Sequence, residues 1–160
     1  AHSSDVLEKP RRTVLLHKGM KSLAWLFVAW TLFAGDAPAV HKLEWKTLRT
    51  LNYKTGEQSA ELKKASGQIA KVPGFMIPLE DDAEMVSEFL LVPYVGACIH
   101  TPPPPPNQIV HVKVENGRKT KLSFWDPVWV QGRFEVVTVK SPYGDVSFKM
   151  TATYIEPYKD

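Results

Sequence analysis

A cysteine and a histidine stand two residues apart at Cys98 and His100, just ahead of a run of prolines. Cys98 is the only cysteine in the 160 residues, so it forms no internal disulfide. A thiolate and an imidazole are ligands for zinc or copper(I), and a thiol beside an imidazole is also the start of a nucleophile pair. The two residues therefore predict either a metal site with an incomplete ligand set or a reactive thiol.

The element that would position this pair is an extended strand. Residues 95–100 alternate apolar side chains with Gly96, Cys98 and His100, which predicts a strand whose odd-numbered residues face the core. Because successive side chains of a strand point to opposite faces, Cys98 and His100 are expected on the same, less apolar face.

Five prolines follow the pair and fix the direction of the chain, because each ring locks its φ angle. Such a run favours a polyproline II rod, which serves either as a docking surface or as a rigid connector packed on the protein. The residues predicted to bind a partner are Tyr94, Pro102, Pro103, Pro104, Pro105, Pro106, Asn107 and Gln108.

The N-terminal region has the pattern of a secretory signal. Met20 and Lys21 precede an apolar run from Leu23 to Gly35, and a small-x-small sequence ends at Ala39. The run is shorter than the roughly 20 residues that a membrane-spanning helix needs. We expect residues 1–19 to be an upstream or non-native segment, residues 20–39 to be a signal peptide, and cleavage to follow Ala39.

The rest of the chain is almost neutral. Residues 40–160 carry 15 Lys and Arg against 14 Asp and Glu, a formal net charge of +1, compared with +3 for the whole chain. Nucleic-acid-binding domains usually carry a basic stripe, so this balance argues against that class of partner.

Short strands dominate the remaining sequence. Residues 40–66 are expected to form a short helical and loop arm, with a helix at residues 60–65. Residues 67–160 are expected to form the β domain, because strand formers recur around 69–79, 86–92, 108–124, 128–139 and 146–155. The pattern predicts a mainly β protein, a small antiparallel OB-like barrel, with a β-sandwich as the alternative.

The clearest local signal lies in residues 108–124. Three valines alternate there with His111, Lys113 and Glu115, and Asn116–Gly117 then supplies two residues that tolerate positive φ. This arrangement predicts a tight β-hairpin at residues 116–117. On that alternation His111 is expected to face solvent, although it is also a candidate third metal ligand.

Several longer motifs resemble a bacterial family known only as domain of unknown function 3299. They include Pro73–Gly74–Phe75, residues 88–94, Gly96–Ala97–Cys98–Ile99–His100 and residues 102–108, with further similarity at 128–132 and 155–158. The resemblance implies an exported or lipoprotein-type protein whose relatives are often encoded near ABC transport systems linked to metals. No reaction is established for that family, and the lack of a lipobox cysteine here implies a soluble periplasmic form.

Three functions follow as expectations. The first is a periplasmic accessory protein that binds zinc or copper(I) through Cys98 and His100 and assists an ABC-type transporter, contacting the membrane only through that partner. The second is a non-catalytic interaction module that uses the proline segment. The third is a thiol-dependent enzyme, which lacks an identifiable orienting acid. Two ligands are too few for a closed zinc site, and the candidates for further ligands are His111, Met76, Met85 and Met150.

Overall fold

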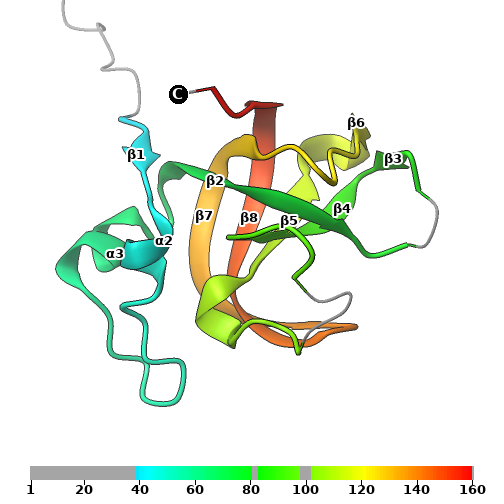
Figure 1. Ribbon diagram of the computed structural model, residues 1–160. Coiled ribbons are helices and arrows are strands. Elements are labelled where there is room, and N and C mark those ends of the chain that lie inside the picture. The colour runs from blue at the N-terminus through cyan, green and yellow to red at the C-terminus, as the bar shows by residue number, and fades with distance from the viewer. Residues whose placement is uncertain (1–38, 81–82, 98–101, 160) are drawn as a thin grey trace, which may run out of the picture. The chain divides into compact units, whose positions relative to one another are not determined.

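The computed structural model describes residues 39–80, 83–97 and 102–159 (Figure 1). Among these residues no helix is long and apolar enough to cross a membrane. The strands are β1 (His41–Lys42), β2 (Ile69–Pro78), β3 (Met85–Val86), β4 (Glu88–Val92), β5 (Val110–Val114), β6 (Thr120–Lys121), β7 (Val128–Ser141) and β8 (Gly144–Pro157). The helices are α2 (Trp45–Leu48) and α3 (Ala60–Ala65), with single 3-10 turns η2 (Pro106–Gln108) and η3 (Glu115–Gly117).

Five strands form a ring in the order β2, β4, β5, β8, β7 and back to β2. The pairs in this ring are antiparallel except for β5 with β8, which run parallel. The prediction of a mainly β, barrel-like domain with few helices is confirmed. The sheet is mixed, however, and the ring is not a clean antiparallel barrel.

The bend of β2 closes the ring. Residues Ile69–Gly74 pair with β7, whereas Phe75–Pro78 pair with β4, so one strand changes neighbours at Gly74. A Cβ atom on Gly74 would lie 2.7 Å from the carbonyl oxygen of Val92, which leaves no room for a side chain. Proline and glycine both suit a bend at this point, because Pro73 gives no ladder N–H and Gly74 permits close backbone approach.

The main core fills the ring and includes side chains from the N-terminal helices. Leu48 of α2 and Leu62 of α3 are fully buried in the same cluster as Phe134 of β7 and Phe148 of β8. The predicted helix at residues 60–65 is confirmed, and it begins where the Ser59 side chain accepts a hydrogen bond from the Leu62 backbone N–H at 3.2 Å. This cap satisfies one of the free N–H groups at the start of the helix.

The predicted hairpin at residues 116–117 is wrong in its pairing. Asn116 and Gly117 do have positive φ, at 57° and 65°. The turn sends the chain away from β5, and β6 pairs with β3 in a separate two-stranded sheet. The sites beside β5 are occupied by β4 and β8, so no edge is left for a hairpin partner.

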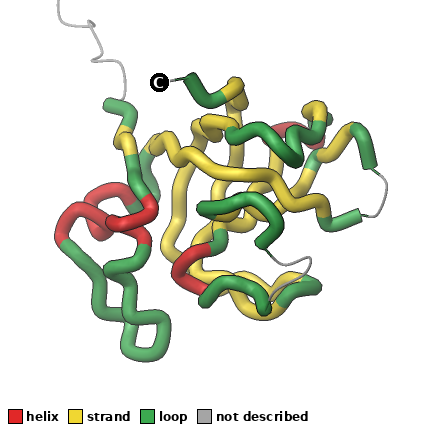
Figure 2. The backbone as a smooth tube through the Cα atoms, viewed as in Figure 1, coloured by secondary structure: helices red, strands yellow, loops and turns green. Residues whose placement is uncertain are grey.

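The segment between β4 and β5 contains no strand among its described residues, 93–97 and 102–109. Its described residues are loop apart from the turn η2, as Figure 2 shows. In the sequence this segment carries most of the predicted functional residues, while His111 is on β5.

Candidate functional site

The predicted pair Cys98 and His100 lies outside the described residues. Immediately before it, residues 95–97 form a turn rather than the predicted strand, and Gly96 has a φ of +77°. Val95, expected in the core, is 43% exposed, whereas Ala97 is fully buried as expected. The prediction that Cys98 and His100 share one face assumed a strand over residues 95–100, and residues 95–97 do not form it.

Ala97 is buried in a second, smaller hydrophobic cluster. This cluster contains Leu90 and Val92 of β4, Ile109, Val146 of β8 and Ile77 of β2. Leu90 and Val92 alternate with Phe89 and Leu91, which belong to the main core. Strand β4 is consequently buried on both faces, with the loop residue Ala97 packed on its outer side.

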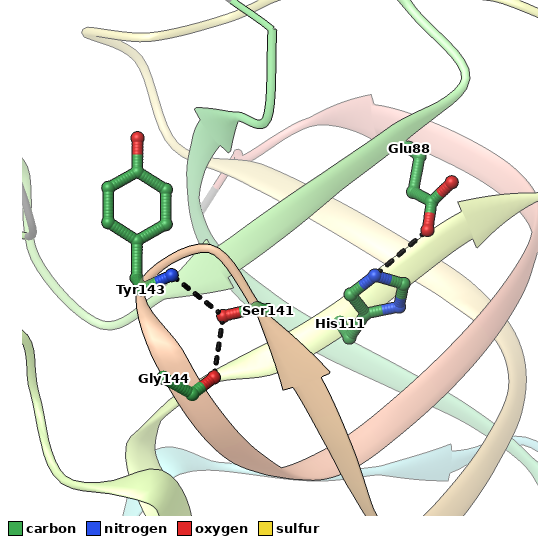
Figure 3. A network of polar contacts seen from close by, with 5 residues as sticks. All are labelled: Glu88, His111, Ser141, Tyr143 and Gly144. Atoms are coloured by element: carbon green, nitrogen blue, oxygen red, sulfur yellow. Dashed lines mark hydrogen bonds and ion pairs between the residues drawn. The ribbon is translucent and has the colours of Figure 1, made fainter.

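The turn between β7 and β8 contributes to the same region. Ser141 Oγ donates to the Gly144 carbonyl oxygen at 2.7 Å and accepts from the Tyr143 backbone N–H at 3.2 Å (Figure 3). These two hydrogen bonds fix the turn that precedes Val146, one of the residues of the second cluster. The turn therefore holds Val146 in place against the outer face of β4.

His111 lies on this outer face and is buried, so the expectation that it faces solvent is wrong. Its backbone pairs with Leu90 of β4 on one side and Lys149 of β8 on the other, and the residue is only 8% exposed. Strand alternation identified the outer face correctly but could not show that this face is covered.

Glu88 holds the His111 ring. The distance from His111 Nε2 to Glu88 Oε1 is 2.9 Å, and the two side chains point toward one another in Figure 3. In a neutral imidazole that donates through Nε2, the lone pair is on Nδ1. His111 Nδ1 is buried, and it has no hydrogen-bond partner among the described residues. Metal-binding histidines commonly show this arrangement, with one nitrogen donating to a carboxylate and the other free to bind the ion.

Burial lowers the pKa of His111 below its ordinary value of 6.5. Desolvation is the main cause, and the positive charges of Lys149 and Lys113 act in the same direction. The carboxylate of Glu88 opposes the change but does not overcome it. His111 is therefore neutral at pH 7, which is the protonation state that binds metals.

This pKa predicts how stability depends on pH. Because the native pKa of His111 lies below 6.5, the unfolded chain binds more protons as the pH falls through and below 6.5, and the free energy of unfolding decreases. Urea unfolding at pH 7 and pH 5 should show a larger loss in the wild type than in His111→Gln, which cannot titrate. An equal loss in the two proteins would contradict the burial argument.

The proline segment is held on one side and exposed on the other. Pro104 is buried, whereas Pro102, Pro103 and Pro105 are exposed. The Asn107 side chain donates to the Leu51 carbonyl oxygen at 2.9 Å and thereby ties η2 to the N-terminal region. Of the other residues predicted to bind a partner, Tyr94 is 47% exposed, while Pro106 and Gln108 are half-buried.

Sequence reasoning missed Glu88 as a functional residue. The pairing of Glu88 with Lys113 and of Leu90 with His111 places it diagonally across the ladder from His111, and only the strand register reveals this. Of the other suggested ligands, Met76 and Met150 are fully buried in the main core, and Met85 is 47% exposed on β3. The described residues contain no group of three or more His, Cys, Asp or Glu side chains that could hold a metal.

The chain matches the model of a protein family and is similar to a solved structure from that family. The family model described as "Protein of unknown function (DUF3299)" matches residues 35–157. The crystal structure of a DUF3299 family protein from Pseudomonas aeruginosa PAO1 is similar, with 33% sequence identity and a TM-score of 0.59. The similarity covers 76% of this chain and 98% of that chain. The comparison with curated proteins finds no match.

The family model extends from before β1 to the last residue of β8, so the match includes the whole ring and the segment between β4 and β5. The chain belongs to the DUF3299 family.

Proposed function

We propose that this protein is a periplasmic accessory protein that binds zinc or copper(I) and assists an ABC-type transport system. Its metal ligands are Cys98, His100 and His111. The observation that supports the proposal best is the His111 ring, which Glu88 holds by Nε2 while the buried Nδ1 has no hydrogen-bond partner among the described residues.

The chemistry of the three side chains is consistent with these metals. Imidazole and thiolate together favour zinc or copper over hard cations such as magnesium and calcium, which prefer oxygen ligands. Three protein ligands leave the fourth coordination position of zinc open, and an open site suits transfer to a partner better than permanent storage. The lowered pKa of His111 supports binding at neutral pH, since the ring has no proton to lose there.

Metal titration of the full-length protein under reducing conditions tests the proposal. Zinc and copper(I) should each be titrated into the wild type, Cys98→Ala and His111→Gln, with binding followed by competition with a coloured chelator. We expect both substitutions to weaken binding of the preferred metal. Glu88→Gln should weaken it by about 10- to 100-fold, because the carboxylate orients a ligand without binding the metal.

His41→Gln is the matched control. His41 is a half-buried histidine of β1 and lies on a different strand pair from His111. Circular dichroism should establish that each variant folds before its affinity is compared. The proposal is overturned if the wild type binds neither metal, or if Cys98→Ala and His111→Gln bind as tightly as His41→Gln.

A second candidate function is a protein-interaction module. The observation that favours it is the pattern of the proline segment, where Pro104 is buried and Asn107 is tied down while the neighbouring prolines are exposed. A metal-free capture of the transporter that is lost in the double variant Pro102→Ala/Pro103→Ala would support this function instead. Rapid alkylation of Cys98 at neutral pH without metal would favour a thiol enzyme.

A further inference from the structure

Strand β8 has an edge that extends beyond its partner β5. The parallel pairing with β5 ends at Val114 and Ala152, whereas β8 continues to Pro157, paired only with β7 among the described residues. Along this stretch, alternate backbone N–H and C=O groups of β8 point away from β7. The free edge, residues 153–157, can therefore accept another strand.

A groove runs beside the free edge. It consists of two adjoining hollows of about 500 and 220 Å³, which share Thr120 and Ile155 as lining residues. One wall is β8, and the other is the segment 118–126, which contains β6 and leads toward β7 (Figure 1). The groove therefore follows the direction of β8.

The groove already contains one hydrogen bond of the kind that a strand would make. The Arg118 guanidinium donates to the Thr153 carbonyl oxygen at 3.1 Å, so a backbone acceptor of β8 faces this side, and an incoming strand would take the place of Arg118 there. Gln131 pairs with Tyr154 and Gly132 with Ala152, so Thr153 is the extra residue of a bulge. A bulge directs backbone groups out of the ladder, which accounts for the exposed acceptor.

The charge of the groove identifies the kind of segment that fits. Its cationic side chains are Arg118, Lys119 and Lys121, all exposed. The groove has two carboxylates, and that of Glu156 is neutralised by an ion pair with Lys71. The three positive charges of the groove are therefore opposed by the single negative charge of Asp126. An acidic partner is therefore favoured over a basic or neutral one.

Trp125 provides an apolar anchor at the rim. Its side chain is 74% exposed and touches Phe124 edge to face, with ring centroids 4.7 Å apart. A large aromatic residue that is so exposed beside a hollow is typical of a binding surface, where tryptophan often contributes much of the affinity.

We propose that this groove binds an extended acidic segment of a partner protein, which adds to the free edge of β8 as a strand. Backbone hydrogen bonds to residues 153–157 provide the docking, the three cations select acidic side chains, and Trp125 holds an apolar side chain of the segment. The groove does not include any of the proposed metal ligands, so this interaction is independent of the metal.

The test uses the full-length protein and blocked eight-residue peptides. The first peptide alternates Glu and Val, the second alternates Lys and Val, and the third is the Glu–Val peptide with alternate backbone nitrogens methylated. The Glu–Val peptide should bind and shift the NMR amide signals of residues 153–156, since Pro157 has no amide proton. Methylation removes backbone N–H donors of the peptide and should weaken binding by about 10-fold or more. A loss of about 1.4 kcal/mol of hydrogen bonding corresponds to a factor of 10 in affinity.

Variants locate the site. Trp125→Ala and Lys121→Glu should each weaken the Glu–Val peptide by about 10-fold. Tyr143→Ala, which removes an exposed aromatic side chain next to the first residue of β8, should leave binding unchanged. The proposal fails if the Glu–Val peptide does not bind, if methylation has no effect, or if a single-stranded DNA oligomer or vesicles of anionic lipid bind to the same residues more tightly.

Discussion

Gly132→Ala is expected to prevent stable folding. A Cβ atom at Gly132 would lie 2.0 Å from the carbonyl oxygen of Thr151 and 2.8 Å from the Cα atom of Ala152. Both contacts are with backbone, so no side-chain rotation relieves them. They lie in the β7–β8 ladder, the pairing of the two longest strands of the ring. Separating the two strands should cost on the order of 4 kcal/mol or more, a large share of the 5–15 kcal/mol that stabilises a typical domain.

The control is Gly56→Ala. A Cβ atom at Gly56 meets nothing within 4 Å, and only its φ of +80° disfavours a side chain. That conformation costs about 1–2 kcal/mol for an ordinary residue. Urea unfolding followed by tryptophan fluorescence should therefore give a stable Gly56→Ala protein and a Gly132→Ala protein that is unfolded or close to it. Equal losses of unfolding free energy in the two variants would show that the β7–β8 ladder adapts to a methyl group, and the predicted clash at Gly132 would be wrong.

Gly132 illustrates what the sequence reveals well. A glycine inside a long run of strand formers predicts a bulge or a close approach, and both occur, because the register shifts between Gln131 and Gly132. The same holds for Pro73–Gly74, where β2 bends and changes neighbours. These signals are local, since they depend on the conformation and size of one or two residues.

Pairing between distant strands could not be predicted in the same way. Asn116 and Gly117 adopt the positive φ angles that a hairpin needs, yet β6 pairs with β3. The reason is competition, because β8 occupies the edge of β5 where a hairpin partner would lie. Turn chemistry determines the local conformation, while the choice of partner depends on all strands together.

The candidate site was predicted only in part for a related reason. Alternation placed His111 on the outer face of β5, and outer faces are usually solvated. Here Leu90 and Ile109 on the same face are buried with Ala97 and Val146, so the face is covered. Burial of His111 follows from that cover, and its pairing with Glu88 follows from the register between β4 and β5. The sequence of β5 alone encodes neither.

Leu62→Ala tests whether the N-terminal helices and the β ring form one cooperative core. Leu62 lies on α3, is fully buried, and belongs to the same cluster as Phe89 of β4 and Met150 of β8. Removing its side chain leaves a cavity against these strands, so the free energy of unfolding should fall by about 2–5 kcal/mol. The ring should weaken together with the helix, because they share the cavity.

The measurement is urea unfolding followed both by far-UV circular dichroism and by near-UV signals from the tryptophans. In Leu62→Ala both probes should move to a lower midpoint together, as expected for a single transition. Lys63→Ala is the matched control, since Lys63 is exposed on the same helix and its loss should change stability by no more than about 0.5 kcal/mol.

Two separated transitions in Leu62→Ala would mean that residues 40–66 unfold on their own. In that case Leu62 would stabilise an arm that is only attached to the ring, and the metal-binding variants would have to be compared in proteins whose arm is intact. A single transition would instead mean that a loss of stability anywhere in residues 40–159 reaches His111, since its strand β5 is part of the same cooperative unit.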